Sequence, residues 1–168
     1  MRLIILGMGG YGRTVADVAD QTGRYKEIVF LDDQAEQALD VCDAYRKYVD
    51  DETEMYPAFG NNELRDTWFN KLEEAKIPVA TIIHPFAYVS PRAVVASGCV
   101  ILPYAVVNTE CEIRESCIVN CGAIIDHGCI LEQGVHVAPG AVIKAENRIP
   151  AGMKIDSGEI IQNRRYPL

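Results

Sequence analysis

The second half of the chain repeats a six-residue pattern of small and aliphatic side chains. From Ala87 to Ala141 every sixth residue is Ala, Cys or Val, and the residue two positions later is always Val, Ile or Leu. The lattice continues less regularly through Asn147, Met153 and Glu159, each followed two residues later by isoleucine. An α-helix repeats its apolar face about every 3.6 residues and a half-buried strand about every two, so neither explains this period.

A period of six residues is typical of a parallel β-helix, in which each hexad forms one short strand and one corner of a triangular prism. Three hexads, about 18 residues, complete one triangular coil, so residues 18 apart should stack over about four coils. The expected columns are Val107, Ile125, Ile143 and Ile161, and Ile101, Val119, Val137 and Ile155. A prism of this kind leaves flat faces open, so we expect lateral association into a cyclic homotrimer.

The first half alternates short apolar runs with stretches that have one apolar face, an order that predicts a small parallel sheet with right-handed connections. Strands are expected at 2–6, 27–31, 55–59 and 78–83, helices at 13–21 and after Asn61 or Asn62, and a poorly defined helix within 34–53. The expected buried stripe of the helix after Asn61 or Asn62 is Leu64, Trp68, Leu72 and Ala75. The predicted fold class is α/β plus β, with a Rossmann-like domain over 1–84 and a left-handed parallel β-helix over 85–168.

A glycine-rich loop, Gly7 to Gly12, follows the first expected strand. Glycine lets a backbone approach a phosphate, whose charge is then stabilised by the N-terminus of the following helix. Asp32 and Asp33 end the second strand, where a carboxylate can accept a hydrogen bond from a ribose hydroxyl. A tight turn that needs glycine for backbone reasons alone is the alternative. Because the unit is short and no substrate domain follows it, a single nucleotide such as the UDP of a sugar nucleotide fits better than the dinucleotide of an oxidoreductase.

Charge and composition limit the classes of molecule that are expected to bind the chain. Among 168 residues, 16 are Lys or Arg and 24 are Asp or Glu, so the formal net charge is −8, which disfavours nucleic acid and anionic membranes. No apolar run approaches the roughly 18 residues of a membrane span, and no signal peptide is recognisable, so we expect a cytoplasmic protein. Four of the six cysteines lie on the hexad lattice, which indicates buried apolar fillers rather than disulfides.

Five motifs together resemble the hexapeptide-repeat acyltransferases that carry an N-terminal nucleotide-binding domain. They are GMGGYG, FLDD (30–33), FGNNELR (59–65), IIHPFAYVSPRAVV (82–95) and VNCGAIIDHGCILEQGVHVAPGA (119–141). The chain is most similar to the sugar-nucleotide N-acetyltransferases of bacillosamine-type pathways and to the sialic acid O-acetyltransferases. The resemblance implies acetyl transfer from acetyl-CoA to an amine or hydroxyl of a sugar or sugar nucleotide.

The same resemblance assigns roles to two histidines and one alanine. His127 matches the general base in a motif similar to I-x-[ED]-H-x-C, and His136 matches a second histidine that helps form the acetyl-CoA site. Ala145 stands where a glycine would let the cofactor approach. Both histidines fall outside the buried lattice, so they should point outward, where an imidazole can take a proton from the attacking group. Exposed histidines without a task are the alternative.

The nucleotide would lie at the edge of the N-terminal sheet. The expected contacts are Gly9, Gly10 and Tyr11 to the phosphates, Asp32 and Asp33 to the ribose or base, and Gly60 and Asn61 at the tip of another strand. A turn with a helix cap explains Asn61 equally well. Asn108 and Asn120 either line the acceptor side or cap turns of the prism.

Other features of the sequence limit the reactions and cofactors that are expected. His84, at the entry to the repeat, is interpreted as structural, and the spacing of His127 and His136 differs from the zinc ligands of γ-class carbonic anhydrases, so no metal is expected. The family often has an acidic residue after the catalytic histidine, where this chain has Gly128, although Asp126 could substitute for it. With the less regular hexads after Gly140, this departure leaves one alternative function, a non-catalytic nucleotide-sugar-binding homologue with a degenerate acyl-CoA site.

Overall fold

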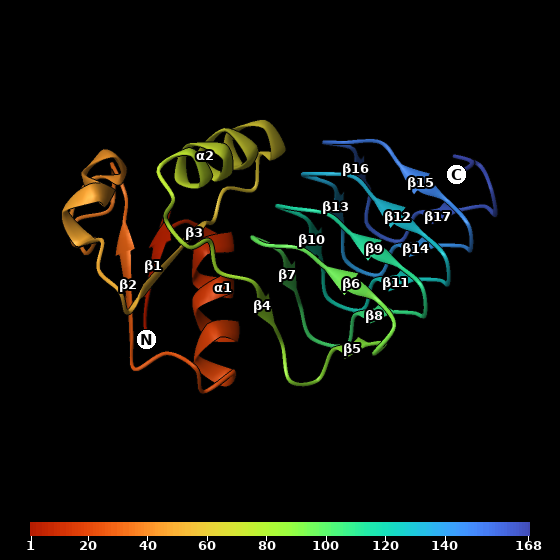
Figure 1. Cartoon of the computed structure of the whole chain (residues 1–168), viewed down its shortest axis with the longest axis horizontal. Helices are drawn as coiled ribbons and strands as arrows, with labels where there is room; N and C mark the ends of the chain where they lie inside the picture. Colours follow the sequence, from red (N-terminus) through yellow and green to blue (C-terminus); the bar gives the residue numbers. More distant parts are fainter.

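The computed structural model describes residues 1–168 and contains an α/β part followed by a long β-helical part (Figure 1). The α/β elements are β1 (Arg2–Leu6), α1 (Gly10–Gln21), β2 (Glu27–Leu31), the 3-10 helix η1 (Cys42–Tyr48), β3 (Thr53–Pro57) and α2 (Asn62–Glu74). The strands form a parallel sheet in the order β2-β1-β3, as the alternating pattern predicts. In the polar stretch 34–53, η1 is the only helix, and neither α1 nor α2 is long and apolar enough to cross a membrane.

The expected strand at 78–83 does not join this sheet as a fourth strand. Val79 makes one isolated parallel bridge to Met55, and Ile82–Ile83 forms β4, which pairs with a strand of the prism. The apolar run is therefore shared between two partners, and Ile82 is fully buried where they meet. The predicted domain boundary at 84/85 stays a prediction, with the first rung of the prism lying just before it.

Helix α2 begins as expected and turns a different stripe inward. The Asn61 side chain caps it, because its Oδ1 accepts the backbone N–H of Leu64 at 2.8 Å. Leu64 is 44% exposed, whereas Arg65, Phe69 and Leu72 are buried, so the predicted stripe is wrong at its first position. The reason is the partner of the helix, since Arg65 bonds to backbone carbonyls of the prism.

The repeat folds into three parallel sheets that close a left-handed prism. The first, here the covered face, consists of β4 (Ile82–Ile83), β7 (Val100–Ile101), β10 (Ile118–Val119), β13 (His136–Val137) and β16 (Lys154–Ile155). The second, the apolar face, consists of β5 (Tyr88–Val89), β8 (Val106–Val107), β11 (Ile124–Ile125), β14 (Val142–Ile143) and β17 (Ile160–Ile161). The third, the charged face, consists of β6 (Val94–Val95), β9 (Glu112–Ile113), β12 (Ile130–Leu131) and β15 (Arg148–Ile149).

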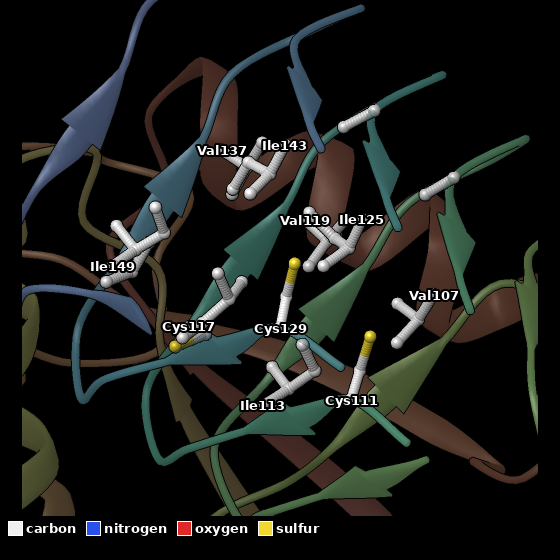
Figure 2. Packing of buried hydrophobic residues seen from close by; sticks show 14 of the residues in the cluster. Val107, Cys111, Ile113, Cys117, Val119, Ile125, Cys129, Val137, Ile143 and Ile149 are labelled. Carbon is white, nitrogen blue, oxygen red and sulfur yellow. The ribbon is translucent and has the colours of Figure 1, made fainter. Parts of the chain in front are cut away.

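The interior of the prism confirms the predicted columns. Val107, Ile125, Ile143 and Ile161 pair in register, and so do Ile101, Val119, Val137 and Ile155. Figure 2 shows the thiols of Cys111 and Cys129 among these aliphatic side chains, and all four lattice cysteines are buried and free, as expected of apolar fillers. Asn147 is also fully buried, and its Nδ2 donates to the carbonyls of Lys144 (2.7 Å) and Gln162 (2.9 Å), which offsets the cost of placing an amide inside the prism.

The covered face packs against the N-terminal part. Ile82, Val100 and Leu102 share one buried cluster with Val15 and Val18 of α1. Figure 1 shows α1 beside β4 and α2 near the later turns of the prism. Helix α2 follows the corner that joins the charged face to the covered face, here called the α2 corner and formed by the turns at Gly98, Ser116, Gly134 and Gly152.

Candidate functional site

The glycine loop has an open side and a closed side. Gly9 caps α1, and side-chain-sized space is free at both Gly9 and Gly10, so a ligand can approach the first N–H groups of the helix. A Cβ on Gly12 would overlap the carbonyl oxygen of Gly7, so only glycine lets this helix pack on the strand end. Gly7, Gly9 and Gly12 also have the spacing G-x-G-x-x-G of nucleotide-binding loops, a signal that can be recognised in the sequence alone.

The two aspartates after β2 are held by backbone groups. The N–H of Met8 donates to Asp32 Oδ2 at 2.6 Å, while Oδ1 accepts the N–H groups of Gln34 and Ala35. These bonds, that of Met8 above all, lower the pKa of Asp32. Asp33 accepts the N–H of Cys42 at 2.9 Å. Both carboxylates therefore shape the edge of the sheet, and their contact with a ribose stays a prediction.

Tyr11 turns its ring away from the open side of the loop. Its hydroxyl lies 2.8 Å from the hydroxyl of Tyr56, and burial raises the pKa of both phenols. Any contact of Tyr11 with a phosphate would therefore use its backbone N–H. At the neighbouring strand end, Gly60 has open space in front of it, and Asn61 serves as the helix cap. Asn62 Nδ2 donates to the carbonyl of Gly152 at 2.9 Å, which brings this edge of the sheet against the prism.

His136 lies on the covered face beside that edge. Its Nε2 is 3.1 Å from Asn120 Nδ2, and Asn120 Oδ1 is already taken by the N–H of Cys121 at 2.8 Å. Asn120 is thus the donor and Nε2 the acceptor, so the neutral ring carries its proton on Nδ1, which is buried and has no partner. Burial, and then the charges of Arg65 and Lys154, lower the pKa of His136 to about 4. The ring is therefore neutral near pH 7, and its one N–H is covered by the chain itself.

His127 lies in very different surroundings. It is exposed in the turn between β11 and β12, and its imidazole makes no hydrogen bond within the chain. Asp126 does not orient the ring, because its Oδ1 accepts the backbone N–H of His127 (2.8 Å) and the Nδ2 of Asn108 (3.3 Å). Ala145 occupies the same corner 18 residues later, and its methyl group is buried. We call this the His127 corner, formed by 108–110, 126–128 and 144–146.

The two histidines do not lie together in one chain. His136 belongs to the covered face, whereas the His127 corner joins the apolar face to the charged face and is the prism edge opposite the covered face. Asn120 accompanies His136, and Asn108 accompanies His127 through Asp126. The predicted site residues thus form two groups, with the expected nucleotide-binding edge on the side of His136.

Two further residues complete the description of the site. His84 is buried, with Nε2 bonded to Gln21 Oε1 at 3.0 Å and Nδ1 accepting the N–H of Phe86 at 3.0 Å, as expected of a structural histidine. Arg65, fully buried at the α2 corner, was not singled out by the sequence pattern, although it closes the motif FGNNELR. No group of three His, Cys, Asp or Glu side chains is arranged to hold a metal ion.

Comparisons with known proteins agree on one family and one fold. Residues 2–72 match the PglD N-terminal domain family. The acetyltransferase domain of PglB from Neisseria gonorrhoeae FA1090 superposes with a TM-score of 0.93 and 30% sequence identity over 97% of this chain and 83% of that chain, and it also matches as a complex with acetyl coenzyme A. A mutant of perosamine N-acetyltransferase from Caulobacter crescentus, in complex with CoA and GDP-perosamine, has a TM-score of 0.66 and 20% identity over 98% of this chain and 91% of its own. WeeI from Acinetobacter baumannii AYE has a TM-score of 0.74 and 16% identity over 99% of this chain and 94% of its own.

Proposed function

Because the chain belongs to the hexapeptide-repeat sugar acetyltransferases with a PglD-type N-terminal domain, we propose that it transfers an acetyl group from acetyl-CoA to an amine or hydroxyl of a sugar nucleotide. The observation that carries the proposal is the pairing of an open nucleotide-type loop with a neutral histidine beside it and an exposed histidine on the prism. A sugar nucleotide has an anionic diphosphate for the loop and a sugar that can reach the prism. Acetyl-CoA is the acetyl donor, as it is the ligand in the complex of the similar PglB domain.

We assign the nucleotide to the edge of the N-terminal sheet. The N–H groups at the start of α1 bind the diphosphate, because Gly9 and Gly10 leave room for it and the helix N-terminus favours negative charge. Gly60 leaves a second open position at the same edge. Since Asn62 bonds to the turn at Gly152, a sugar attached to this nucleotide extends toward the covered face and His136.

His127 acts as the general base in this proposal. Its unpartnered, solvent-exposed imidazole takes a proton from the amine or hydroxyl of the sugar as that group attacks the thioester carbonyl. A C–N or C–O bond forms, the C–S bond breaks, and CoA leaves as a thiolate that recovers the proton. We assign to the Nδ1–H of His136 a hydrogen bond to an oxygen of the acetyl donor or of the tetrahedral intermediate, which requires the side chains that bury this N–H to shift when the donor binds.

A homotrimer would bring the two histidines together. Along the apolar face, Tyr88 is 54%, Ile124 41% and Ile160 52% exposed, and Val106 and Val142 complete an aliphatic stripe. Such a stripe is expected to be covered by a protein surface, and a closed ring of three chains satisfies every copy at once. The His127 corner of each chain borders this face. Within one chain His136 lies on the opposite side of the prism, so a neighbouring chain that packs against the apolar face can bring its own His136 to this His127.

The activity is tested by incubating the protein with acetyl-CoA and UDP-linked or GDP-linked amino sugars and following CoA release and acetylated product. Transfer to at least one of these acceptors is the expected result. Calorimetric titration with acetyl-CoA and with each sugar nucleotide runs beside it. Binding of a sugar nucleotide without acetyl-CoA binding or transfer would overturn the proposal and favour a non-catalytic binding homologue.

The shared site is tested by mixing two inactive variants, His127→Ala and His136→Ala, after unfolding and refolding them together. If each site takes one histidine from each of two chains, random trimers regain about a quarter of wild-type activity, because half of the chains supply each intact histidine. Refolding each variant alone is the control, and it should stay inactive. No gain on mixing would show that the site does not combine His127 and His136 from neighbouring chains.

A further inference from the structure

Arg65 is a fully buried cation without a carboxylate partner. Its Nε donates to the carbonyl of Ser116 (3.1 Å) and its Nη2 to the carbonyl of Gly134 (2.8 Å), two turns that are stacked 18 residues apart. Its Nη1 donates to Asn62 Oδ1 (2.9 Å) and to the carbonyl of Phe59 (3.3 Å). The flat guanidinium therefore joins the start of α2 to two successive rungs of the prism, a geometry that its rigid set of donors suits.

The two rungs that Arg65 joins are those that carry the hydrogen-bonded pair Asn120 and His136. Ser116 precedes β10, which Asn120 follows, and Gly134 lies two residues before His136. Three of the four buried polar side-chain atoms without a partner belong to this region, namely Ser116 Oγ, His136 Nδ1 and Asp66 Oδ1. At Ser116 and Gly134 the seam along the α2 corner is thus polar and held by the bonds of Arg65, unlike the apolar contact between α1 and the covered face.

We propose that Arg65 is a positioning residue of the acetyl-transfer site, which holds the rungs of Asn120 and His136 in register and so keeps the imidazole in one orientation and one tautomer. The proposal rests on the function proposed above for His136. It also makes α2, an element of the nucleotide-binding part, a direct support of the prism residue that acts on the acetyl donor. Arg65 touches neither substrate nor cofactor in this account and acts through the backbone carbonyls of Ser116 and Gly134.

The charges around His136 agree with this arrangement. Arg65 comes from α2 and Lys154 from the adjacent strand β16, while β10 contributes the neutral Asn120. Asp66 is the carboxylate on α2 that packs against Gly134, and it is not among the groups that shift the pKa of His136. The positive surroundings therefore reinforce burial in keeping the ring neutral, and removing Arg65 takes away both a charge and the bonds to the two prism carbonyls, those of Ser116 and Gly134.

Two substitutions separate the charge of Arg65 from its geometry. Arg65→Lys keeps the charge but cannot reach both carbonyls with a fixed fork, whereas Arg65→Gln removes the charge as well. Nitrogen-15 NMR of the imidazoles across pH reads the tautomer and titration of His136 without any need for turnover. We expect wild-type protein to show one neutral tautomer, Arg65→Lys a mixture of tautomers, and Arg65→Gln a mixture together with a titration raised by about one pH unit or more.

Kinetics give a second readout on the same variants. Both should lower kcat for acetyl transfer by about 10- to 100-fold, because a small misplacement of an acting group has effects of that size. The control is Gln133→Ala, which removes only the 3.1 Å bond from Gln133 Nε2 to Asn70 Oδ1 on the same seam and should leave the His136 resonances unchanged.

Arg65 variants that fold and show wild-type His136 resonances and titration would overturn the proposal. Failure of both variants to fold would overturn it too, because Arg65 would then serve stability rather than site geometry. A wild-type protein that transfers no acetyl group would instead contradict the proposed function, while the NMR comparison still decides the role of Arg65.

Discussion

His127 and His136 occupy the same type of scaffold but differ in almost every physical respect. His127 lies in an exposed turn and its imidazole has no hydrogen bond within the chain, while His136 lies in a strand under α2 with Asn120 bonded to its Nε2. Every hexad of the prism has outward positions both in its turn and in its strand, so the repeat alone does not explain why the surroundings of the two histidines differ. Helix α2 sets the difference, because this helix follows the α2 corner and leaves the His127 corner uncovered.

If both histidines act as proposed, the contrast shows how one repeat can supply two kinds of catalytic group. A general base has to exchange protons with solvent and substrate, which an exposed ring does well. A hydrogen-bond donor to a developing charge works best when its orientation and proton are fixed beforehand. In the proposed mechanism the second need is met with Arg65 and the start of α2, which bond to the rungs of Asn120 and His136, rather than with the repeat alone.

The largest expected effect comes from removing His127, the proposed general base. His127→Ala should lower kcat for acetyl transfer by about 10²- to 10⁴-fold, the usual range for a lost general base. Its thermal midpoint should stay close to that of wild-type protein, because the imidazole is exposed and makes no hydrogen bond in the chain. Steady-state CoA release and thermal unfolding monitored by circular dichroism measure the two quantities.

Thr109→Ala is the matched control for this substitution. Thr109 occupies the equivalent position one coil earlier at the His127 corner, so the control measures the effect of altering this corner without the imidazole. We expect turnover close to wild type. Unchanged turnover in His127→Ala would remove His127 from the base role.

The prism was predictable because its interior imposes a rule on every sixth residue. From Ala87 to Ala141 only small or aliphatic side chains occupy these positions, so the lattice cysteines and the aliphatic columns were correctly placed from the sequence. The segment 78–83 and the stripe of α2 were not, because both depend on contacts between the two parts of the chain. Arg65 faces inward where a hydrophobic pattern favours Leu64, since its partners are carbonyl oxygens that no pattern of apolar residues reveals.

The roles of the candidate site residues stay predictions, and only part of their arrangement follows from the sequence. Nine residues separate His127 from His136, which is half of one 18-residue coil, so their opposite placement could have been derived from the repeat. The bonds of Asp32 and the buried hydroxyl of Tyr11 could not, because they depend on how the glycine loop folds back on its neighbours. For the same reason, the sequence alone does not show that Asp126 bonds to the backbone rather than to the ring of His127.

A pair of alanine substitutions compares the α2 corner, which helix α2 covers, with the uncovered His127 corner. Gly128, beside His127, and Gly134, before His136, have φ of 65° and 73°, where any other residue is strained. Gly128→Ala meets only Glu146 Cγ at 3.7 Å, so we expect a loss of about 1 kcal/mol in the free energy of unfolding. Gly134→Ala places its methyl group on the carboxylate of Asp66, so the strain and the overpacking together should cost about 2–4 kcal/mol.

Urea unfolding of the two glycine variants beside wild type measures the difference. Gly134→Ala should also perturb the NMR resonances of His136, whereas Gly128→Ala should leave them unchanged. Equal losses of stability in both variants would show that α2 yields easily at its corner, and would weaken the idea that it fixes the rung of His136.

The smallest expected effect concerns the protonation of His136 in acid. Its pKa is about 4 in the folded chain, against an ordinary value of 6.5, so between these pH values the unfolded chain binds more protons than the folded one. The contribution of the neutral His136 to the free energy of unfolding is therefore complete above about pH 6.5 and is lost as the pH falls toward 4. Because the ring is partly exposed, we expect a contribution of only about 1–2 kcal/mol.

Urea unfolding of His136→Gln and wild type at pH 7 and pH 4.5 measures this contribution. Between these pH values the variant should lose about 1–2 kcal/mol less stability than wild type, because Asp32 and the other acid-sensitive carboxylates are common to both proteins. Parallel losses in the two proteins would mean that His136 titrates alike in the folded and unfolded chain, and the ring could then no longer be treated as a neutral donor fixed by its surroundings.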